Sequence, residues 1–328
     1  MIPSEQLVEE SQTYLAMAIA PSTHRNYSSA WQAYKTFCRH INRTTLPPAQ
    51  SILILFATHL ASFSSYSNIK RHISAITHFS TLHGHDAQIH TFHRLYLLIR
   101  GIKRSQGSSR SLPKRLPITP NILHTIRLNL FRSQRLYEDK TLLWAAILTA
   151  FFGFLRVSEY TSTHKTKFDP DTTLLMSDVQ ISDSAATLHI KASKTDPFRQ
   201  GIHIRIAAND TQLCPVNALK LFLNTRKQID GPLFTYTNNK YLTRADVNKT
   251  LSTFTNGAAD ISSHSLRIGA ASTAAAMGCP KWLIQGMGRW TSDCYRRYIH
   301  IADDTIMSTS RALARCNFSN LEHFNPHT

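Results

Sequence analysis

His264-Ser-Leu-Arg267, followed by Gly288-Arg-Trp290 and Arg297-Tyr298-Ile299, places a His/Arg pair, an indole donor and a tyrosine within 35 residues of sequence. Ser262 or Ser263 caps a predicted helix at the first motif, and a spacing of three residues puts its His and Arg on one helical face. Because a helix N-terminus also favours an anion, this face predicts a phosphate site. An indole donor follows, and then a tyrosine, whose phenol can form a covalent phosphoester.

Each of these side chains also has an ordinary structural interpretation. His264 and Arg267 fit the solvated first turn of a buried helix. Trp290 fits a core position, and Tyr298 fits an aromatic stripe with Tyr295, one turn away. The order of the residues along the chain, more than any one of them, favours a site.

Further cations lie upstream. Arg156 directly follows the apolar helical segment Leu142–Leu155, where an unpaired charge is costly. Glu159 either pairs with this arginine as part of the structure or orients its guanidinium towards a phosphate. Lys191 and Lys194 fall at the end of a predicted strand. A lysine at a hairpin tip can protonate a leaving oxygen, although a solvated loop lysine is the simpler interpretation of either one.

The charge of the chain is unevenly distributed. Its 328 residues carry a formal net charge of +17, and between Ser11 and Tyr137 there are sixteen Lys and Arg and a single acid, Asp86. Such a basic half attracts a polyanion, of which nucleic acid is the usual one. An anionic membrane surface is disfavoured, because the charges are spread over a whole predicted domain and not gathered on one amphipathic helix.

Composition also limits the kind of site. No apolar segment reaches the roughly 20 residues of a membrane-spanning helix, and the N-terminus lacks the pattern of a signal peptide. Five Cys without a C-x-x-C pair indicate a reducing compartment and no structural zinc, and the seventeen His lack a metal-site spacing. We therefore expect no metal, no other cofactor and no secretion.

The predicted fold is mainly α-helical with a small antiparallel β-sheet. Ser22 is expected to cap a first helix with one aromatic face, and Pro215 suits the first turn of a later one. The further helices are expected over Ala49–Phe63, Ser67–His83, Ile89–Lys103, Thr119–Phe131, Lys140–Tyr160, Cys214–Thr225 and Thr243–Phe254, and the strands over Thr172–Met176, Asp178–Ile181, Ala186–Ala192 and Gly201–Ile206. We expect a domain of about four helices over 1–104, a basic Ser/Gly-rich linker over 105–116, an α+β domain over 117–302 and a C-terminal segment over 303–328.

The joint order of these residues resembles the tyrosine recombinase, or phage-integrase-like, family. An arginine ends a helix, a lysine lies on a hairpin, and His-x-x-Arg, Trp and Tyr follow, so that the match extends from Thr119 to Tyr298. The helical region Ser22–Lys103 resembles the core-binding domain of that family. The phrases Ser193-Lys-Thr-Asp-Pro-Phe-Arg199 and Cys214-Pro-Val-Asn-Ala-Leu219 look most like the eukaryotic branch carried by crypton- and DIRS-type mobile elements.

The resemblance implies an enzyme that integrates or excises DNA without metal or ATP. Arg156 and Arg267 would clamp the scissile phosphate, and His264 and Trp290 would hydrogen-bond to it, with Trp290 where many relatives carry histidine. Lys194, in preference to Lys191, would be the general acid. Tyr298 would attack, leaving a 3′-phosphotyrosyl bond and a free 5′-hydroxyl.

The resemblance also implies partners and a location. Double-stranded DNA would be bound by a homo-oligomer, a dimer on each site and a tetramer in the synapse, with 303–328 docking onto a neighbouring subunit. A eukaryotic member would act in the nucleus, and otherwise in the cytoplasm or nucleoid. The candidate DNA contacts are Arg25, Lys70, Arg71, Lys103, Arg104, Arg110, Lys114, Arg115, Arg199 and Arg289.

Three rival functions follow from the same residues. The first is a recombinase-derived DNA-binding protein that no longer cuts. The second is a nicking and resealing enzyme like a type IB topoisomerase, which uses similar chemistry without synapsis. The third is a basic scaffold, which explains the charge but not the ordered set of site residues.

Overall fold

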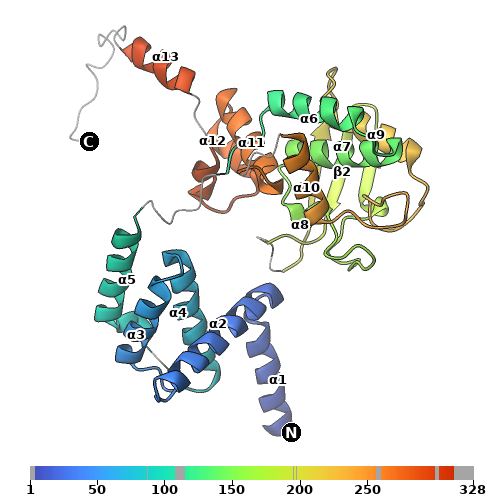
Figure 1. Ribbon diagram of the computed structural model, residues 1–328. Coiled ribbons are helices and arrows are strands. Elements are labelled where there is room, and N and C mark those ends of the chain that lie inside the picture. The colour runs from blue at the N-terminus through green and yellow to red at the C-terminus, as the bar shows by residue number, and fades with distance from the viewer. Residues whose placement is uncertain are drawn as a thin grey trace, which may run out of the picture. The chain divides into compact units, whose positions relative to one another are not determined.

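The chain folds into two compact units, Met1–Pro113 and Lys114–Thr328. The computed structural model describes residues 4–86, 88–107, 115–194, 196, 198–255, 260–299 and 303–313. Helices make up most of both units, and the second also holds a three-stranded antiparallel sheet (Figure 1). The predicted fold class, mainly α with a small antiparallel sheet, is confirmed. Within the described ranges, no helix has the length and apolar character needed to cross a membrane.

The first unit is built on an aromatic core. Trp31 stacks on Phe79 with ring centroids 5.5 Å apart, and Tyr34 meets Phe56 edge-on at 5.2 Å. Tyr34 is fully buried, so the predicted aromatic face points into this core. The helices of this unit are α1 (Ser4–Met17), α2 (Pro21–His40), α3 (Gln50–Ala61), α4 (Tyr66–Leu82) and α5 (His93–Gln106), with a 3-10 turn, η1 (Ile89–Thr91).

Two predicted helix starts in this unit are wrong. Ser22 does not cap α2, because the helix already begins at Pro21, where a residue without an N–H leaves no donor unpaired. The predicted helix Ile89–Lys103 is divided at Phe92, whose backbone is not helical. The backbone N–H of Arg94 in the first turn of α5 instead donates to the side chain of Gln50 at 3.1 Å.

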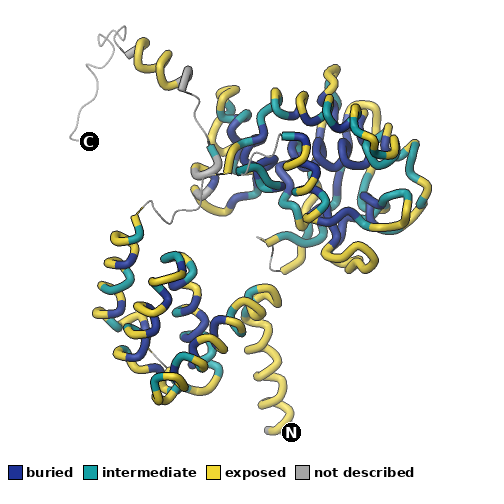
Figure 2. The backbone as a smooth tube through the Cα atoms, in the orientation of Figure 1, coloured by how far each residue is buried: buried dark blue, intermediate teal, exposed yellow. Residues whose placement is uncertain are grey.

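The second unit is organised around α7 (Tyr137–Phe152), which is buried over every residue from Thr141 to Phe151. Helices α6, α9, α10 and α11 pack against it, and buried residues fill the interior of the unit (Figure 2). The elements of this unit besides α7 are α6 (Pro120–Arg132), α8 (Val157–Tyr160), η2 (Met176–Asp178), β1 (Val179–Ile181), β2 (Ala185–Ile190), β3 (Ile202–Ala207), α9 (Pro215–Thr225), α10 (Arg244–Phe254), α11 (Ser263–Ala276), α12 (Lys281–Gly288), η3 (Asp293–Tyr298) and α13 (Asp303–Leu313).

The sheet has the strand order β1-β2-β3 with antiparallel pairing throughout. Leu188 on the central strand pairs with Val179 on one side and Ile204 on the other. The predicted strand Thr172–Met176 is wrong. The Asp169 carboxylate accepts from the Asp171 N–H at 3.0 Å and the Thr172 hydroxyl at 3.1 Å, which forms a turn there.

The predicted single helix Lys140–Tyr160 is also wrong, because the chain breaks between α7 and α8. Phe154 adopts a positive φ of 50°, and Arg156 then occupies the N-cap of α8. The break turns the Phe154 carbonyl towards two arginines, Arg267 and Arg289, which donate to it. A buried apolar segment thereby ends beside a group of charges.

Candidate active site

A pocket of about 510 Å³ in the second unit brings together five residues of the predicted catalytic set. They come from four separate parts of the chain, and the lining contains no carboxylate. Glu159, outside the lining, pairs with Arg156, but the lining itself places no acid beside its other cations, which suits a polyanionic ligand. The complete lining is Arg115, Arg156, Val157, Lys194, Arg244, Ser263, His264, Arg267, Trp290 and Thr291.

Arg267 is the most deeply buried of the set, with 1% of its surface exposed. It lies on α11, whose N-cap Ser262 donates its N–H to the Ser265 hydroxyl at 3.1 Å. The guanidinium donates through Nη1 to the Phe154 carbonyl and through Nη2 to the Gly288 carbonyl. These bonds join α11 to the break after α7 and to the end of α12, so the arginine holds the floor of the pocket in one geometry.

Glu159 connects two arginines at the pocket wall. Its Oε1 lies 3.0 Å from Nη1 of Arg156, and its Oε2 lies 2.7 Å from Nη2 of Arg289. Oε2 also accepts from the Arg156 backbone N–H at 2.8 Å. The carboxylate is 2% exposed, so these charge-assisted bonds are shielded from water. The ion pair between Glu159 and Arg156 is therefore present, and the orientation of this guanidinium towards a phosphate stays a prediction.

Arg289, predicted as a DNA contact, lies in a buried ion pair. Its side chain is only 9% exposed and is bound to Glu159 and to the Phe154 carbonyl. As a DNA contact it stays a prediction, but one that would need this buried ion pair to open. Because removing either partner leaves a buried charge unpaired, we expect Arg289 to matter for the fold of the pocket.

The structure separates the two candidate lysines. Lys191 forms an ion pair with Asp178, with Nζ 2.7 Å from Oδ2. Lys194 is exposed in the connection between β2 and β3 and lines the pocket. The turn that carries it is held by Asp196, which accepts from the backbone N–H of Gly201 at 2.8 Å. The pocket therefore receives Lys194 and not Lys191.

His264 is neutral at pH 7. Burial, together with the nearby charges of Arg115, Arg267, Arg156 and Arg244, lowers the pKa of its imidazole to about 4. A neutral imidazole carries one N–H donor and one acceptor nitrogen. An anion in the pocket would offset the arginine charges and so raise this pKa.

This pKa makes stability depend on pH in a defined direction. The folded pKa is about 4 and the ordinary value is 6.5, so between these values the unfolded chain binds a proton that the folded chain refuses. Stability is complete above about pH 6.5 and falls as the pH drops towards 4. We expect His264→Gln to flatten this part of the profile, measured as the thermal unfolding midpoint between pH 7 and pH 4. Equal slopes in the two proteins would contradict the assignment.

Trp290 is both a core residue and a pocket residue. It is 6% exposed, and its ring lies under the Arg267 guanidinium with 4.5 Å between the guanidinium carbon and the ring centroid. The Gln285 side chain donates to its carbonyl at 3.0 Å. The ring also fills the space beside Gly288, where a Cβ atom would lie 1.7 Å from the indole.

Gly288 is therefore expected to be intolerant of any side chain. We expect Gly288→Ala to displace the Trp290 ring and to cost at least about 1–3 kcal/mol of stability, the range for overpacked sites. Gly286, on the same helix and with no atom within 4 Å of its virtual Cβ, provides the matched control. Gly286→Ala should be neutral or stabilising by about 0.5–1 kcal/mol, because alanine is the better helix former. Similar urea midpoints for both variants would refute this packing argument.

Tyr298 ends the 3-10 helix η3, which also carries Tyr295. This element packs against α11 and α12. The side chain of Tyr298 lies outside the described part of the structure. Tyr295, one turn earlier, is 2% exposed, and its ring centroid lies 6.1 Å from that of Trp290.

Arg244 lines the pocket but was not predicted. It is the first residue of α10, after the Thr243 cap, and only the contact of α10 with α11 brings it here. Arg115 was expected as a linker contact to DNA. The next residues dock on the second unit, with Leu116 N–H donating to the Asp260 carbonyl at 3.1 Å, and so bring Arg115 to the pocket.

The other candidate DNA contacts are spread over both units. Lys70 on α4 and Lys103 on α5 lie over the same Tyr66 ring, 6.0 and 5.4 Å from its centroid. The remaining exposed ones are Arg25, Arg71, Arg104 and Arg199, whereas Arg110 and Lys114 lie outside the described residues. Among the residues that the structure describes, no three His, Cys, Asp or Glu side chains are grouped to hold a metal ion.

Comparison with known proteins finds similarity in sequence and in fold. The chain is 23% identical over 242 residues to an integrase/recombinase XerD homolog of Selenomonas ruminantium. That match covers 70% of this chain and 64% of the relative, so the chain spans less than two thirds of the relative's length. No protein-family model matches the chain.

Solved structures with the same fold include three DNA complexes of recombinases. The XerH site-specific recombinase bound to palindromic difH substrate has a TM-score of 0.56 at 14% identity, over 87% of this chain and 77% of that one. A lambda integrase dimer, residues 75–356, bound to a COC′ core site has 0.54 at 16%, over 91% and 96%. The Tn1549 transposon integrase with circular intermediate DNA has 0.52 at 14%, over 86% and 98%. The chain is thus similar in sequence to a recombinase homolog, and it shares the fold of these recombinases and integrases.

Proposed function

We propose that this protein is a site-specific DNA recombinase that cuts and rejoins double-stranded DNA through a phosphotyrosyl bond. One observation carries the proposal: Arg156, Lys194, His264, Arg267 and Trp290, far apart in sequence, line one cationic pocket without a carboxylate. Such a lining stabilises charge on the nonbridging oxygens of a phosphodiester in the transition state. The DNA in the solved XerH and lambda integrase complexes supports the choice of substrate.

In this proposal the phosphate is held by groups whose orientation is set in advance. Arg156 offers the guanidinium that Glu159 fixes at 3.0 Å. Arg267 contributes its buried charge, and Trp290 its indole N–H. His264, neutral at pH 7, donates one N–H to a nonbridging oxygen. Because these donors are fixed before the DNA arrives, little reorganisation is needed during the reaction.

The bond changes balance without an outside energy source. The Tyr298 oxygen attacks phosphorus and its phenol proton passes to solvent, the bond from phosphorus to the 5′ oxygen breaks, and Lys194 gives that oxygen a proton. The 3′ end remains on the tyrosine. A 5′-hydroxyl from another duplex then attacks the phosphotyrosine, which restores a phosphodiester and frees the tyrosine. One ester replaces another at each step, so neither ATP nor a metal is part of the proposal.

The same proposal covers the type of mobile element, the roles of the domains and the oligomeric state. The phrases Ser193–Arg199 and Cys214–Leu219 support a recombinase of a crypton- or DIRS-type mobile element, acting in the nucleus. Residues 1–104 would grip DNA with their exposed basic side chains, 105–116 would link the domains, and 117–302 would carry out catalysis. A dimer would occupy each site and a tetramer the synapse, with 303–328 docking onto a neighbouring subunit.

A suicide substrate tests the proposal directly. The protein is incubated in EDTA with nicked duplexes that carry the terminal sequences of the DNA element encoding it, and a denaturing gel then detects protein covalently bound to DNA. We expect a covalent complex, because the nick lets the 5′ fragment diffuse away and traps the phosphotyrosine. Tight DNA binding without such a complex would overturn the enzyme and favour the DNA-binding protein derived from a recombinase. Relaxation of plasmids that lack any such site would favour the topoisomerase-like enzyme.

A further inference from the structure

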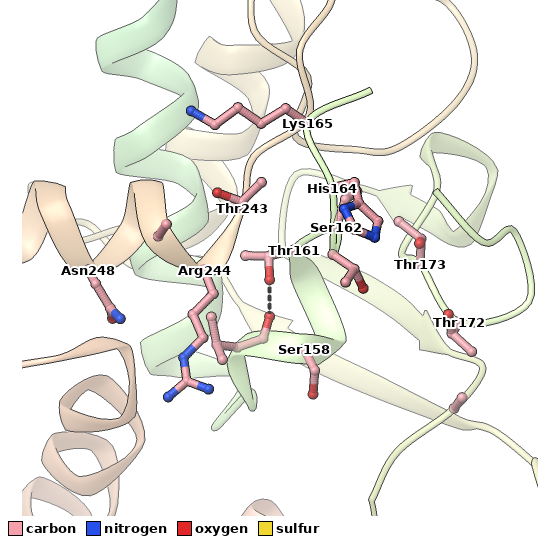
Figure 3. A pocket seen from close by; sticks show the side chains of 14 residues that line it. Ser158, Thr161, Ser162, His164, Lys165, Thr172, Thr173, Thr243, Arg244 and Asn248 are labelled. Carbon is pink, nitrogen blue, oxygen red and sulfur yellow. Dashed lines mark hydrogen bonds between the residues drawn. The ribbon is translucent and has the colours of Figure 1, made fainter. Parts of the chain in front are cut away.

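A second and larger pocket lies beside the candidate active site. Its volume is about 930 Å³, and it shares Val157 and Arg244 with the active-site pocket, so the two meet at these residues. Its wall comes from α8, the loop after it, the Thr172–Thr173 turn, Ala192 after β2 and the start of α10 (Figure 3). None of the candidate site residues named from the sequence lines this pocket.

The lining of this second pocket has the composition of a phosphate site. Seven of its side chains are Ser or Thr, three are His, Lys or Arg, and none is a carboxylic acid. Some of these groups are already occupied: the Thr161 hydroxyl donates to the Val157 carbonyl at 2.6 Å, and Lys165 is paired with Asp246 at 3.0 Å. The cation that remains nearest to the active site is Arg244.

Arg244 is held at the junction by the fold of its backbone. The Ser162 N–H donates to the Leu242 carbonyl at 2.9 Å, which ties the loop after α8 to the start of α10. Figure 3 shows the Arg244 guanidinium and the Ser158 hydroxyl extending towards the same end of the pocket, whereas Lys165 points to the opposite end. Within the described residues, neither Arg244 nor Ser158 has a hydrogen bond or ion pair, and both are exposed.

The electrostatics of the junction favour an anion. Arg244 lies close enough to His264 for its charge to lower the pKa of the imidazole, together with Arg115, Arg267 and Arg156. Glu159 compensates Arg156, but the active-site lining holds no carboxylate beside Arg115 and Arg244, and a polyanion relieves the repulsion among such like charges. A single phosphate fits one pocket, whereas two pockets joined by a shared arginine suit two phosphates of one strand.

We propose that the second pocket binds the DNA backbone phosphate next to the scissile one, with Arg244 bridging the two phosphates and Ser158 donating to the outer one. The proposal rests on the proposed recombinase function and deepens it. Arg244 is a binding residue here, and it sets the register of the strand so that the correct phosphate enters the active-site pocket. Phosphate contacts of this kind position a duplex without reading its sequence.

Charge-neutral methylphosphonates at single positions test the proposal. The full-length protein and Arg244→Ala are compared on nicked duplexes that carry a methylphosphonate at each phosphate flanking the cleavage site in turn. On native DNA we expect Arg244→Ala to bind roughly tenfold or more weakly and to lower the salt slope by about one. At one flanking position the methylphosphonate should weaken the wild type and leave Arg244→Ala almost unaffected, because the variant has already lost that contact.

Lys249 provides a matched control on the same helix. It is an exposed cation of α10 that lines neither of these two pockets. Lys249→Ala should keep the wild-type response to every methylphosphonate, and Arg244→Lys should keep the salt slope. Circular dichroism and the unfolding midpoint show whether each variant folds.

Two results would overturn the inference. In the first, the loss of binding caused by Arg244→Ala adds to the loss caused by the methylphosphonate at every flanking position. Arg244 would then contact none of these DNA phosphates. A loss that instead changes with the neighbouring base pair would make Arg244 a base contact. Both outcomes are measured as DNA-binding affinity. Formation of a covalent complex by the wild type is a separate measurement, and it tests the proposed recombinase function independently.

Discussion

Tyr298→Phe is expected to abolish the covalent protein–DNA complex while DNA binding persists. The change removes a single oxygen, the proposed nucleophile, and no other residue in the set can form the same ester at that position. Loss of a nucleophile in enzymes that work through a covalent intermediate costs at least about 10⁴-fold in rate. The measurement is the yield of covalent complex on the nicked substrate in EDTA, alongside the dissociation constant from a filter-binding or anisotropy assay.

Tyr295→Phe is the control for that experiment. Tyr295 lies in the same 3-10 helix and is 2% exposed, so its hydroxyl has no access to a bulky substrate. Its ring packs near Trp290, and phenylalanine keeps that contact. We expect near-normal complex formation. If Tyr295→Phe lost the complex and Tyr298→Phe retained it, the assignment of the nucleophile would be reversed.

Lys194→Ala is expected to slow cleavage by about 10² to 10⁴-fold, the usual contribution of a general acid. The loss should disappear when sulfur replaces the 5′ bridging oxygen of the scissile phosphate. A thiol has a pKa near 8.5, so a thiolate leaves without the help of a proton. Single-turnover cleavage of the oxygen and sulfur substrates gives both rates. Persistence of the defect on the sulfur substrate would show that Lys194 does not donate the proton.

Lys191→Ala separates the two lysines. Its ammonium is 2.7 Å from the Asp178 carboxylate and does not line the pocket, so we expect cleavage within a few fold of the wild type on either substrate. A large defect in Lys191→Ala that sulfur rescues would transfer the role of general acid to Lys191. The two variants therefore test a choice that the sequence left open.

Helix ends marked by local chemistry were predicted well. Thr243 caps α10 and Thr119 caps α6, each at the first residue of a predicted helix, and Pro215 occupies the first turn of α9 as expected. These signals are local, since a cap bonds to a backbone group three residues away. The strands β1, β2 and β3 were also found to within a few residues, because alternation of polar and apolar residues is itself a local pattern.

Predictions of secondary structure failed where contacts with residues distant in the chain determine the backbone conformation. Gly153, the C-cap of α7, is the one local signal for the end of this helix, but the apolar run continues past it to Leu155, so the predicted helix extends too far. The Phe154 carbonyl is held by Arg267 and Arg289, more than a hundred residues away in the chain. The strand expected at Thr172–Met176 failed because Asp169 bonds its own neighbours, and Leu175 forms only an isolated bridge with Pro232.

The sequence by itself determined which kinds of side chain are available, in what order, and on which local elements. It thus determined the fold class, the basic character and the candidate set Arg156, Lys194, His264, Arg267 and Trp290. Only the tertiary structure decided which charges remain available to a ligand: it paired Lys191 and Arg289 with carboxylates and brought Lys194 and Arg244 to the pocket. The physical reason is that propensity and capping act over a few residues, whereas ion pairing and burial depend on contacts between segments far apart in the chain.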